Sequence, residues 1–261
     1  MPLMRAHLVQ MNIVWENRDA NCRLVEAMLD GADVREGDLV VLPELFDSGF
    51  SLNTALTKDK DGATLRFLLD LSDDLGVMIH GSRTVLSCDC NKATNRATIV
   101  APHEQVVLEY SKIHPFSYGR EGEAFTGGEV VDVYDWASGN ESLKVCPAVC
   151  YDLRFPELFR KGLALGAEMF VLGANWPDAR QEHWRALAVA RAIENQGFVL
   201  ACNRTGADPH LNYVGGSIAL NPKGDVIAQL GDEEAVLTVE LDPGDLRAWR
   251  DEFPAWKDRK L

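Results

Sequence analysis

Three side chains could form a covalent catalytic site, and each follows a predicted strand. Glu44 comes just after the apolar run 39–42, Lys112 opens a glycine-rich segment, and Cys150 stands at a strand-to-helix turn after 143–149. Active sites of α/β folds lie at such strand ends. A thiol nucleophile needs a proton acceptor, and its tetrahedral adduct needs a positive donor. The residue types favour Cys150 as nucleophile with Glu44 and Lys112 as its partners, but their spacing does not show that the three meet.

The elements that must position these residues alternate between strands and helices, which predicts an α/β layered fold. Helical spacing predicts helices at 17–29, 59–75 and 155–165, and a long helix from an N-cap at Asp178 to Gln196. A turn is expected at 222–225, where proline and glycine interrupt the pattern. Apolar runs predict strands at 5–13, 39–42, 77–85, 93–100, 105–110, 143–149, 169–172, 198–203, 216–220, 226–229 and 235–240.

Two further segments are set apart by their composition. The stretch 111–128 shows no periodicity and is predicted to be a long loop, which inside a compact domain is usually functional. The tail 246–261 contains Trp249, Phe253 and Trp256, too many apolar groups for a free end. We therefore expect a single domain over 1–261, whose C-terminal segment of about 241–261 packs on the body or on a second subunit.

The composition excludes several classes of function. The chain has 261 residues, 46% of them hydrophobic, and a formal net charge of −14. So acidic a composition argues against nucleic acids and anionic membrane surfaces as partners, because both attract basic faces. No apolar run reaches the roughly 20 residues of a spanning helix, and the first residues lack the pattern of a signal peptide. A soluble cytoplasmic protein is the expectation.

The cysteines agree with that compartment. Six of them are spread over a long chain, which is typical of reduced thiols and not of a disulfide framework. Neither the pair Cys88 and Cys90 nor the pair Cys146 and Cys150 has the histidines that would complete a zinc pattern. We expect no structural metal, and a catalytic role remains open for one thiol.

Seven segments together carry a family resemblance. In chain order they are 42–46 with Gly49-Phe50, 110–114 with 121–128, 149–156, 174–177, 190–196, 203–206, and Tyr213 with Gly215 and Ser217. This ordered series resembles the nitrilase superfamily of carbon–nitrogen hydrolases over nearly the whole chain. The resemblance implies a four-layer αββα sandwich and a Glu–Lys–Cys triad. It also implies a homodimer formed through outer helices and the C-terminal segment.

The resemblance assigns a role to each member of the site. Glu44 would be the general base, Cys150 would form a thioester as ammonia leaves, and Lys112 with the backbone N–H of Tyr151 would hold the oxyanion. Glu121 matches the superfamily's second glutamate, although Glu123 lies close enough in sequence to be the alternative. No cofactor is needed, because thiol, carboxylate and lysine supply nucleophile, base and electrophile.

Within the superfamily the segments 46–50 and 174–196 look most like the omega-amidases, which hydrolyse 2-oxoglutaramate to 2-oxoglutarate and ammonia. Arg154 is the candidate for the substrate carboxylate, since its planar fork suits bidentate binding. Phe116, Asn175 and Trp176 are further candidates for the pocket wall. The expected reaction is cleavage of the terminal amide of a small 2-oxo acid amide, 2-oxoglutaramate or 2-oxosuccinamate.

Other interpretations stay open. The substrate could instead be an N-carbamoyl acid, a deaminated glutathione-like amide or, with least support, a nitrile. A non-catalytic binding scaffold is the alternative outside enzymes, although all three triad residue types are present.

Several residues also have a structural interpretation. Arg154 could simply pair with Asp152 or Glu157. A structural role is favoured for Asp152, for the histidines His114 and His183, and for the tryptophans Trp176 and Trp184. Three other cysteines are interpreted as small buried apolar residues and not as nucleophiles, namely Cys22, Cys146 and Cys202.

Overall fold

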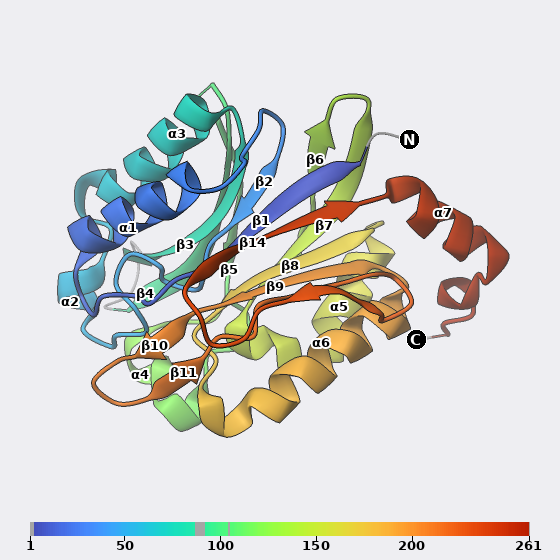
Figure 1. Cartoon of the computed structure of the whole chain (residues 1–261). Coiled ribbons are helices and arrows are strands. Elements are labelled where there is room, and N and C mark those ends of the chain that lie inside the picture. Colours follow the sequence, from blue (N-terminus) through green and yellow to red (C-terminus); the bar gives the residue numbers. More distant parts are fainter. Residues whose placement is uncertain (1–2, 87–91, 104, 261) are drawn as a thin grey trace.

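Two six-stranded sheets pack face to face with helices on both outer faces (Figure 1). The structure is a computed structural model and describes residues 3–86, 92–103 and 105–260. The first sheet, in the order β14-β1-β2-β3-β4-β5, contains Ala235–Leu241, Met4–Gln10, Leu39–Val41, Met78–Leu86, Ala93–Ala101 and Gln105–Ser111. The second, in the order β13-β12-β9-β8-β7-β6, contains Val226–Gln229, Ile218–Leu220, Phe198–Asn203, Met169–Ala174, Glu141–Val149 and Tyr134–Ser138. The expected αββα sandwich is confirmed.

The two sheets share one pairing pattern. Strands β1, β2 and β3 are mutually parallel in the first sheet, as are β7, β8 and β9 in the second. Antiparallel strands flank each parallel group, including β14, whose Leu241 pairs with Met4 at the start of β1. Because parallel strands end at the same edge of a sheet, the loops that follow β7 and β8 lie together. The loop that follows β2 in the other sheet meets them at Gly173 of β8, where the backbone passes close to Leu42 and Glu44.

Helices cover the outer faces. Helices α1 (Arg18–Asp30) and α3 (Ala63–Leu75) lie on the first sheet, and α5 (Pro156–Ala164) and α6 (Gln181–Asn195) lie on the second (Figure 1). Shorter elements are α2 (Thr54–Thr57), α4 (Glu121–Ala124), α7 (Pro243–Glu252) and the strand pair β10 (Thr205–Ala207) and β11 (Asn212–Val214). Within the described ranges, no helix has the length and apolar character needed to cross a membrane.

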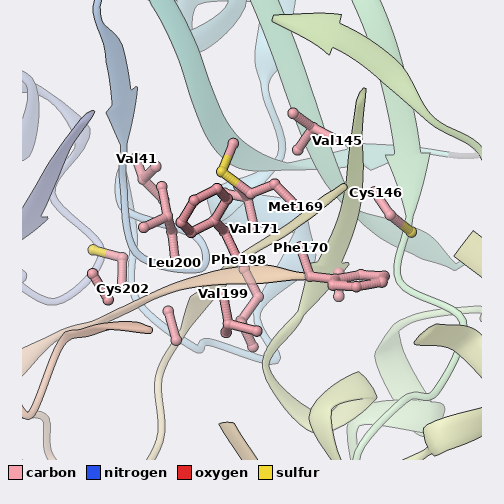
Figure 2. Packing of buried hydrophobic residues seen from close by; sticks show 14 of the residues in the cluster. Val41, Val145, Cys146, Met169, Phe170, Val171, Phe198, Val199, Leu200 and Cys202 are labelled. Carbon is pink, nitrogen blue, oxygen red and sulfur yellow. The ribbon is translucent and has the colours of Figure 1, made fainter. Parts of the chain in front are cut away.

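The main core lies between the sheets. Val41 of the first sheet and Val171 and Leu200 of the second belong to one buried cluster (Figure 2). The two residues next to Val41 in the chain, Val40 and Leu42, face the other way and join the cluster beneath α1 and α3. A strand that is buried on both faces needs a continuous apolar run, and this explains the composition of 39–42.

Most predicted elements are confirmed, with shifts of a few residues at their ends, but the predicted start of α6 is wrong. Asp178 lies in a short 3₁₀ turn, where its side chain accepts from the backbone N–H of Ala179. The helix begins only at Gln181, after Arg180, and has no side-chain cap. The helix predicted at 59–75 also begins late, at Ala63, because the Asp59 carboxylate accepts from the N–H groups of Thr64 and Leu65.

The segment 111–128 is a long connection, as predicted, but it contains a 3₁₀ turn at Ser117–Gly119 and the short helix α4. The C-terminal segment 241–261 contains α7, which the sequence patterns did not predict. Asp242 caps this helix by accepting from the N–H of Gly244. Arg250 donates to the carbonyls of Ala167 and Gln196, which holds the tail against the same chain.

Candidate active site

Glu44 is fixed in the space between the two sheets. Its side chain is completely buried, and one carboxylate oxygen accepts from the backbone N–H of Asn175 at 3.0 Å. Asn95 of β4 donates its amide to the other oxygen at 2.7 Å. The close approach depends on Gly173 of β8, since a Cβ there would lie 2.4 Å from the Leu42 carbonyl oxygen and 2.9 Å from the Glu44 nitrogen.

Lys112 lies between two carboxylates. Its Nζ is 2.8 Å from Glu44 Oε1 and 2.8 Å from Glu121 Oε2, and the side chain is buried. The backbone of Lys112 donates to the Asn95 carbonyl and accepts from the N–H of Gly128. Because a Cβ on Gly128 would lie 2.4 Å from the Ser111 carbonyl oxygen, the loop can close beside the lysine only at a glycine.

Glu121 and Glu123 have different surroundings. Glu121 is fully buried and also accepts from the backbone N–H of Phe116 at 2.5 Å. Glu123 is exposed and forms an ion pair with Arg120 at 2.7 Å. Of the two glutamates, only Glu121 contacts Lys112 among the described residues.

Cys150 occupies a strained turn at the end of β7. Its φ of 45° lies in the left-handed region, which non-glycine residues rarely adopt and which is common at functional sites. Asp152 holds this turn by accepting from the N–H of Val149 at 3.0 Å and from the Tyr110 hydroxyl at 2.7 Å. Cys150 is 8% exposed, and its thiol lies close enough to the Glu44 carboxylate for each group to shift the pKa of the other.

Electrostatics keep the thiol neutral and the base charged. Burial and the negative charge of Glu44 raise the pKa of Cys150 well above its usual range. Burial would also raise the pKa of Glu44, but the Lys112 charge and hydrogen bonds outweigh it, so the pKa is lowered. For Glu121, burial prevails and the pKa is raised. Burial opposes the charge of Lys112, yet Glu121 and Glu44 raise its pKa well above normal. The resting site thus contains a thiol beside a carboxylate that can accept its proton.

A cavity of about 660 Å³ opens onto this cluster. Glu44, Lys112 and Cys150 all line it, together with Phe116 and Asn175. Most of the remaining wall is aromatic or apolar, and its polar members include Glu16, Asp208 and Arg180; the full wall adds Trp15, Phe50, Ser51, Leu52, Asn53, Tyr118, Gly119, Pro177, Ala179, His210, Leu211 and Tyr213. A pocket of this size and composition suits a small organic molecule.

Arg154, Tyr151 and Trp176 line a narrower pocket of about 30 Å³, which also reaches Cys150. The guanidinium of Arg154 lies 4.8 Å from the centre of the Trp176 ring and 3.3 Å from Nδ1 of His183. The predicted alternative, an ion pair with Asp152 or Glu157, is wrong: Asp152 is occupied by Tyr110, Val149 and His114, and none of the ion pairs among the described residues joins Arg154 to Glu157.

Other side chains have structural contacts. Nδ1 of His114 is 2.7 Å from Asp152, and its ring stacks on Phe155. Trp184 is buried and donates to the Gly216 carbonyl. Four cysteines are free thiols, namely Cys22, Cys146, Cys150 and Cys202, whereas Cys88 and Cys90 lie outside the described residues. No cluster of metal-ligating side chains occurs in the part of the chain that the structure describes.

Two residues of the site escaped the sequence analysis. Asn95 bridges Glu44 and Glu121, with its amide 2.7 Å from the first and 3.2 Å from the second. An asparagine in a strand that also contains Thr94, Arg96 and Thr98 is a weak signal for such a role. Arg180 lies just beyond the segment Ala174–Pro177 but looks like an ordinary helix-start residue in sequence.

Comparisons with known proteins identify the family and fold of the chain. Residues 5–251 match the family described as carbon–nitrogen hydrolase. The chain is 35% identical over 260 residues to the omega-amidase YafV of Escherichia coli strain K12, covering 99% of this chain and 97% of that protein. It is 32% identical to a 2-oxoglutaramate amidase of Bacillus subtilis, with 96% and 95% covered. The structure matches XC1258 of Xanthomonas campestris, a CN-hydrolase superfamily protein with an arsenic adduct in its active site. That match has a TM-score of 0.92 and 31% identity, with 100% of this chain and 98% of that chain covered.

Proposed function

Because the chain belongs to the carbon–nitrogen hydrolase family of the nitrilase superfamily, and is an omega-amidase-like hydrolase of non-peptide carbon–nitrogen bonds, we propose that it cleaves the terminal amide of a small 2-oxo acid amide. The preferred substrates are 2-oxoglutaramate and 2-oxosuccinamate, and the products are the 2-oxo dicarboxylate and ammonia. The proposal is supported by the relatives that carry this activity in their names and by a cluster of Glu44, Lys112 and Cys150 at the base of a cavity.

The first half of the reaction forms a thioester. The Cys150 thiol donates its proton to Glu44 while the sulfur attacks the amide carbon. The charge that develops on the amide oxygen is stabilised by Lys112 and by the backbone N–H of Tyr151. The carbon–nitrogen bond then breaks, Glu44 returns its proton to the nitrogen, and ammonia leaves.

The second half releases the acid. Glu44 accepts a proton from a water molecule as that water attacks the thioester carbon, and the same two donors hold the oxyanion. Collapse of the adduct breaks the carbon–sulfur bond, and the proton on Glu44 returns to the sulfur. Glu121 keeps Lys112 in place throughout, as the distance of 2.8 Å between them supports.

Arg154 binds the carboxylate of the substrate, at the end of the molecule away from the reacting amide carbon. Trp176 and Tyr151 would support that guanidinium by cation–π contact, at 4.8 Å and 5.9 Å. Phe116 and Asn175 complete the wall beside the thiol. Arginine suits this role because its planar fork can donate two hydrogen bonds to one carboxylate.

The observation that carries the proposal is the hydrogen-bonded cluster in which Lys112 lies between Glu44 and Glu121 beside Cys150. It is tested by ammonia release from 2-oxoglutaramate, 2-oxosuccinamate, glutamine, an N-carbamoyl amino acid and an aliphatic nitrile. We expect turnover of a 2-oxo amide by the wild type and none by Cys150→Ala, with Cys202→Ala as the matched buried-thiol control. Activity of Cys150→Ala would refute the mechanism, and failure of both 2-oxo amides would refute the substrate.

One observation favours a second candidate substrate class. The cavity of about 660 Å³ is much larger than a five-carbon acid amide. An N-carbamoyl acid or a deaminated glutathione-like amide would fill more of it. The same panel separates these substrates when a longer amide is added.

For the non-catalytic scaffold, we expect slow and uniform alkylation of accessible thiols by iodoacetamide, whereas catalysis predicts selective alkylation of Cys150.

We propose further that the protein is a cytoplasmic homodimer. The dimer is supported by apolar side chains on the outer surface of the second sheet's helices and of the C-terminal segment. Ile193 of α6 is 51% exposed and Phe253 after α7 is 54% exposed, and both line a groove of about 430 Å³. Exposed apolar groups that share a groove are typical of an interface.

A further inference from the structure

Arg180 is a cation of the main cavity that the proposed mechanism leaves without a role. It lines both the wide cavity and the narrow pocket, and Cys150 lines both as well. Arg154, in contrast, lines only the narrow pocket. The wide cavity is the one that has room for a substrate, so the Arg180 guanidinium can contact a substrate that binds there.

The backbone of Arg180 is held firmly. It ends the 3₁₀ turn Asp178–Arg180, its N–H donates to the Pro177 carbonyl, and its own carbonyl accepts from Nε1 of Trp176 at 2.8 Å. Trp176 is buried, so the turn is anchored in the protein interior. The side chain therefore extends into the cavity from a fixed base.

The guanidinium of Arg180 has aromatic neighbours but no carboxylate partner among the residues that the structure describes. Its centre lies 5.3 Å from the Phe116 ring and 6.0 Å from the Tyr118 ring. The acids of the same wall are otherwise engaged, because Glu16 accepts from Ser51 and Asp208 from Tyr213. A guanidinium on an aromatic face can still donate all its N–H groups at the edge, so Arg180 is available to an anion.

The charge of the whole protein makes such a cation significant. At a formal net charge of −14, the average field opposes the approach of an anion. Phe116 also links Arg180 to the reacting cluster, since its backbone N–H donates to Glu121. An anion bound by Arg180 would therefore lie beside the same loop that positions Lys112.

We infer that Arg180 is a second anion-binding residue of the active site and that it makes the enzyme select amides carrying a free carboxylate over neutral amides. The inference rests on the proposed amidase function. Arg180 contacts the carboxylate from the wide cavity, while Arg154 approaches from the narrow pocket. Arg180 is thus a specificity-determining residue and takes no part in bond making.

The test compares a charged and a neutral amide. In Arg180→Gln we expect the KM for 2-oxoglutaramate to rise about tenfold to a hundredfold, the range for the loss of a charge-assisted hydrogen bond, with kcat nearly unchanged. Hydrolysis of pentanamide, which lacks the carboxylate, should not change. Arg180→Lys keeps the charge and should recover part of the loss. Arg185→Gln, an exposed arginine of α6, is the matched control.

A second measurement is independent of turnover. In the Cys150→Ala background, Arg180→Gln should raise the Kd for 2-oxoglutarate by a similar factor in a calorimetric titration. An unchanged KM and Kd would overturn the inference. So would an equal loss for both amides, because this would indicate that Arg180 only supports Phe116 and Tyr118.

The two proposals can fail separately. If the wild type does not cleave either 2-oxo amide, the proposed substrate is wrong, and the comparison is made with succinamate and butanamide instead. A wild type that prefers the neutral member of that pair overturns the inference about Arg180. If no amide is cleaved, the titration with 2-oxoglutarate still decides it.

Discussion

At the scale of single residues, the site is defined by how one positive charge is shared. Lys112 lies 2.8 Å from each of two buried carboxylates, whose pKa values move in opposite directions. Glu44 stays ionised because it has the lysine, the Asn175 N–H and Asn95 as donors. Groups whose surroundings separate their pKa values in this way are suited to distinct roles.

The first prediction concerns the base. Glu44→Gln should lower kcat/KM about a hundredfold to ten-thousandfold, because the thiol loses its proton acceptor. Iodoacetamide should still alkylate Cys150 in this variant, since alkylation at high pH needs only the free thiolate. Loss of alkylation as well as activity would contradict a specific role as base. Glu123→Gln, which alters an exposed glutamate, is the control.

The pH dependence of the wild type follows from the same shifts. A lowered pKa at Glu44 keeps the base charged at neutral pH, and a raised pKa at Cys150 keeps the thiol protonated well into the alkaline range. Since the proton passes directly to Glu44, kcat/KM should be level from about pH 6 to about pH 9. A tenfold rise per pH unit over that range would show that a free thiolate is the nucleophile.

At the scale of elements, the site depends on how closely the two sheets approach. The end of β2 passes β8 at Gly173, where a Cβ would lie 2.4 Å from the Leu42 carbonyl oxygen. Another contact joins the sheets where Nδ1 of His80 in β3 is 3.3 Å from the Tyr134 hydroxyl of β6. Both contacts involve groups that cannot move into solvent.

Gly173→Ala should therefore affect stability and activity together. The added methyl group has to displace backbone and not a flexible side chain, so we expect a loss of about 1–3 kcal/mol in the free energy of unfolding. Displacement of Glu44 should lower kcat as well. Gly31→Ala is the control, because the nearest atom to its Cβ is 3.6 Å away. Urea denaturation and ammonia release measure the two effects, and a Gly173→Ala variant with wild-type values would disprove the close approach.

His80 should make the fold sensitive to acid. Burial lowers its pKa from 6.5 to about 3, so the folded protein binds this proton less readily than the unfolded chain. The contribution of His80 to the free energy of unfolding is then complete above the pKa of the unfolded chain and is lost as the pH falls below that value. The loss is about 2 kcal/mol between pH 7 and pH 5. The free energy of unfolding of His80→Asn should fall less over that interval. An equal fall in both proteins would contradict the assignment.

The sequence predicted the two strands that lead to the nucleophile and the base, because the burial of both strands is nearly complete. The runs 39–42 and 143–149 are strands because they are buried on both faces, and so the ends that carry Glu44 and Cys150 could be located. Strands β6, β10 and β11 were missed because short or half-polar segments are strands only when their partners are known. Asn95 and Arg180 were missed for a related reason, since the register of a strand and the start of a helix decide where they lie.

At the scale of the whole molecule, the proposed dimer is open to a direct test. Light scattering should give a mass about twice the 28.9 kDa of one chain. Ile193→Lys should shift this mass toward the monomer, because the substitution replaces an exposed apolar side chain with a charge in the groove that contains Phe253. Leu56→Lys, which alters an exposed leucine of α2 on the other sheet, should leave the mass unchanged. A wild-type monomer would refute the proposal.

The pairing of β14 with β1 has a consequence for synthesis of the chain. Met4 finds its partner in Leu241, so the outer edge of β1 has no neighbour while most of the protein is being made. During translation the first half, with Glu44, Lys112 and Glu121, emerges before β14, the strand that pairs with β1 at the edge of this sheet. Open strand edges favour pairing with other chains. We therefore expect the growing polypeptide to depend on chaperones until residues 235–241 have left the ribosome.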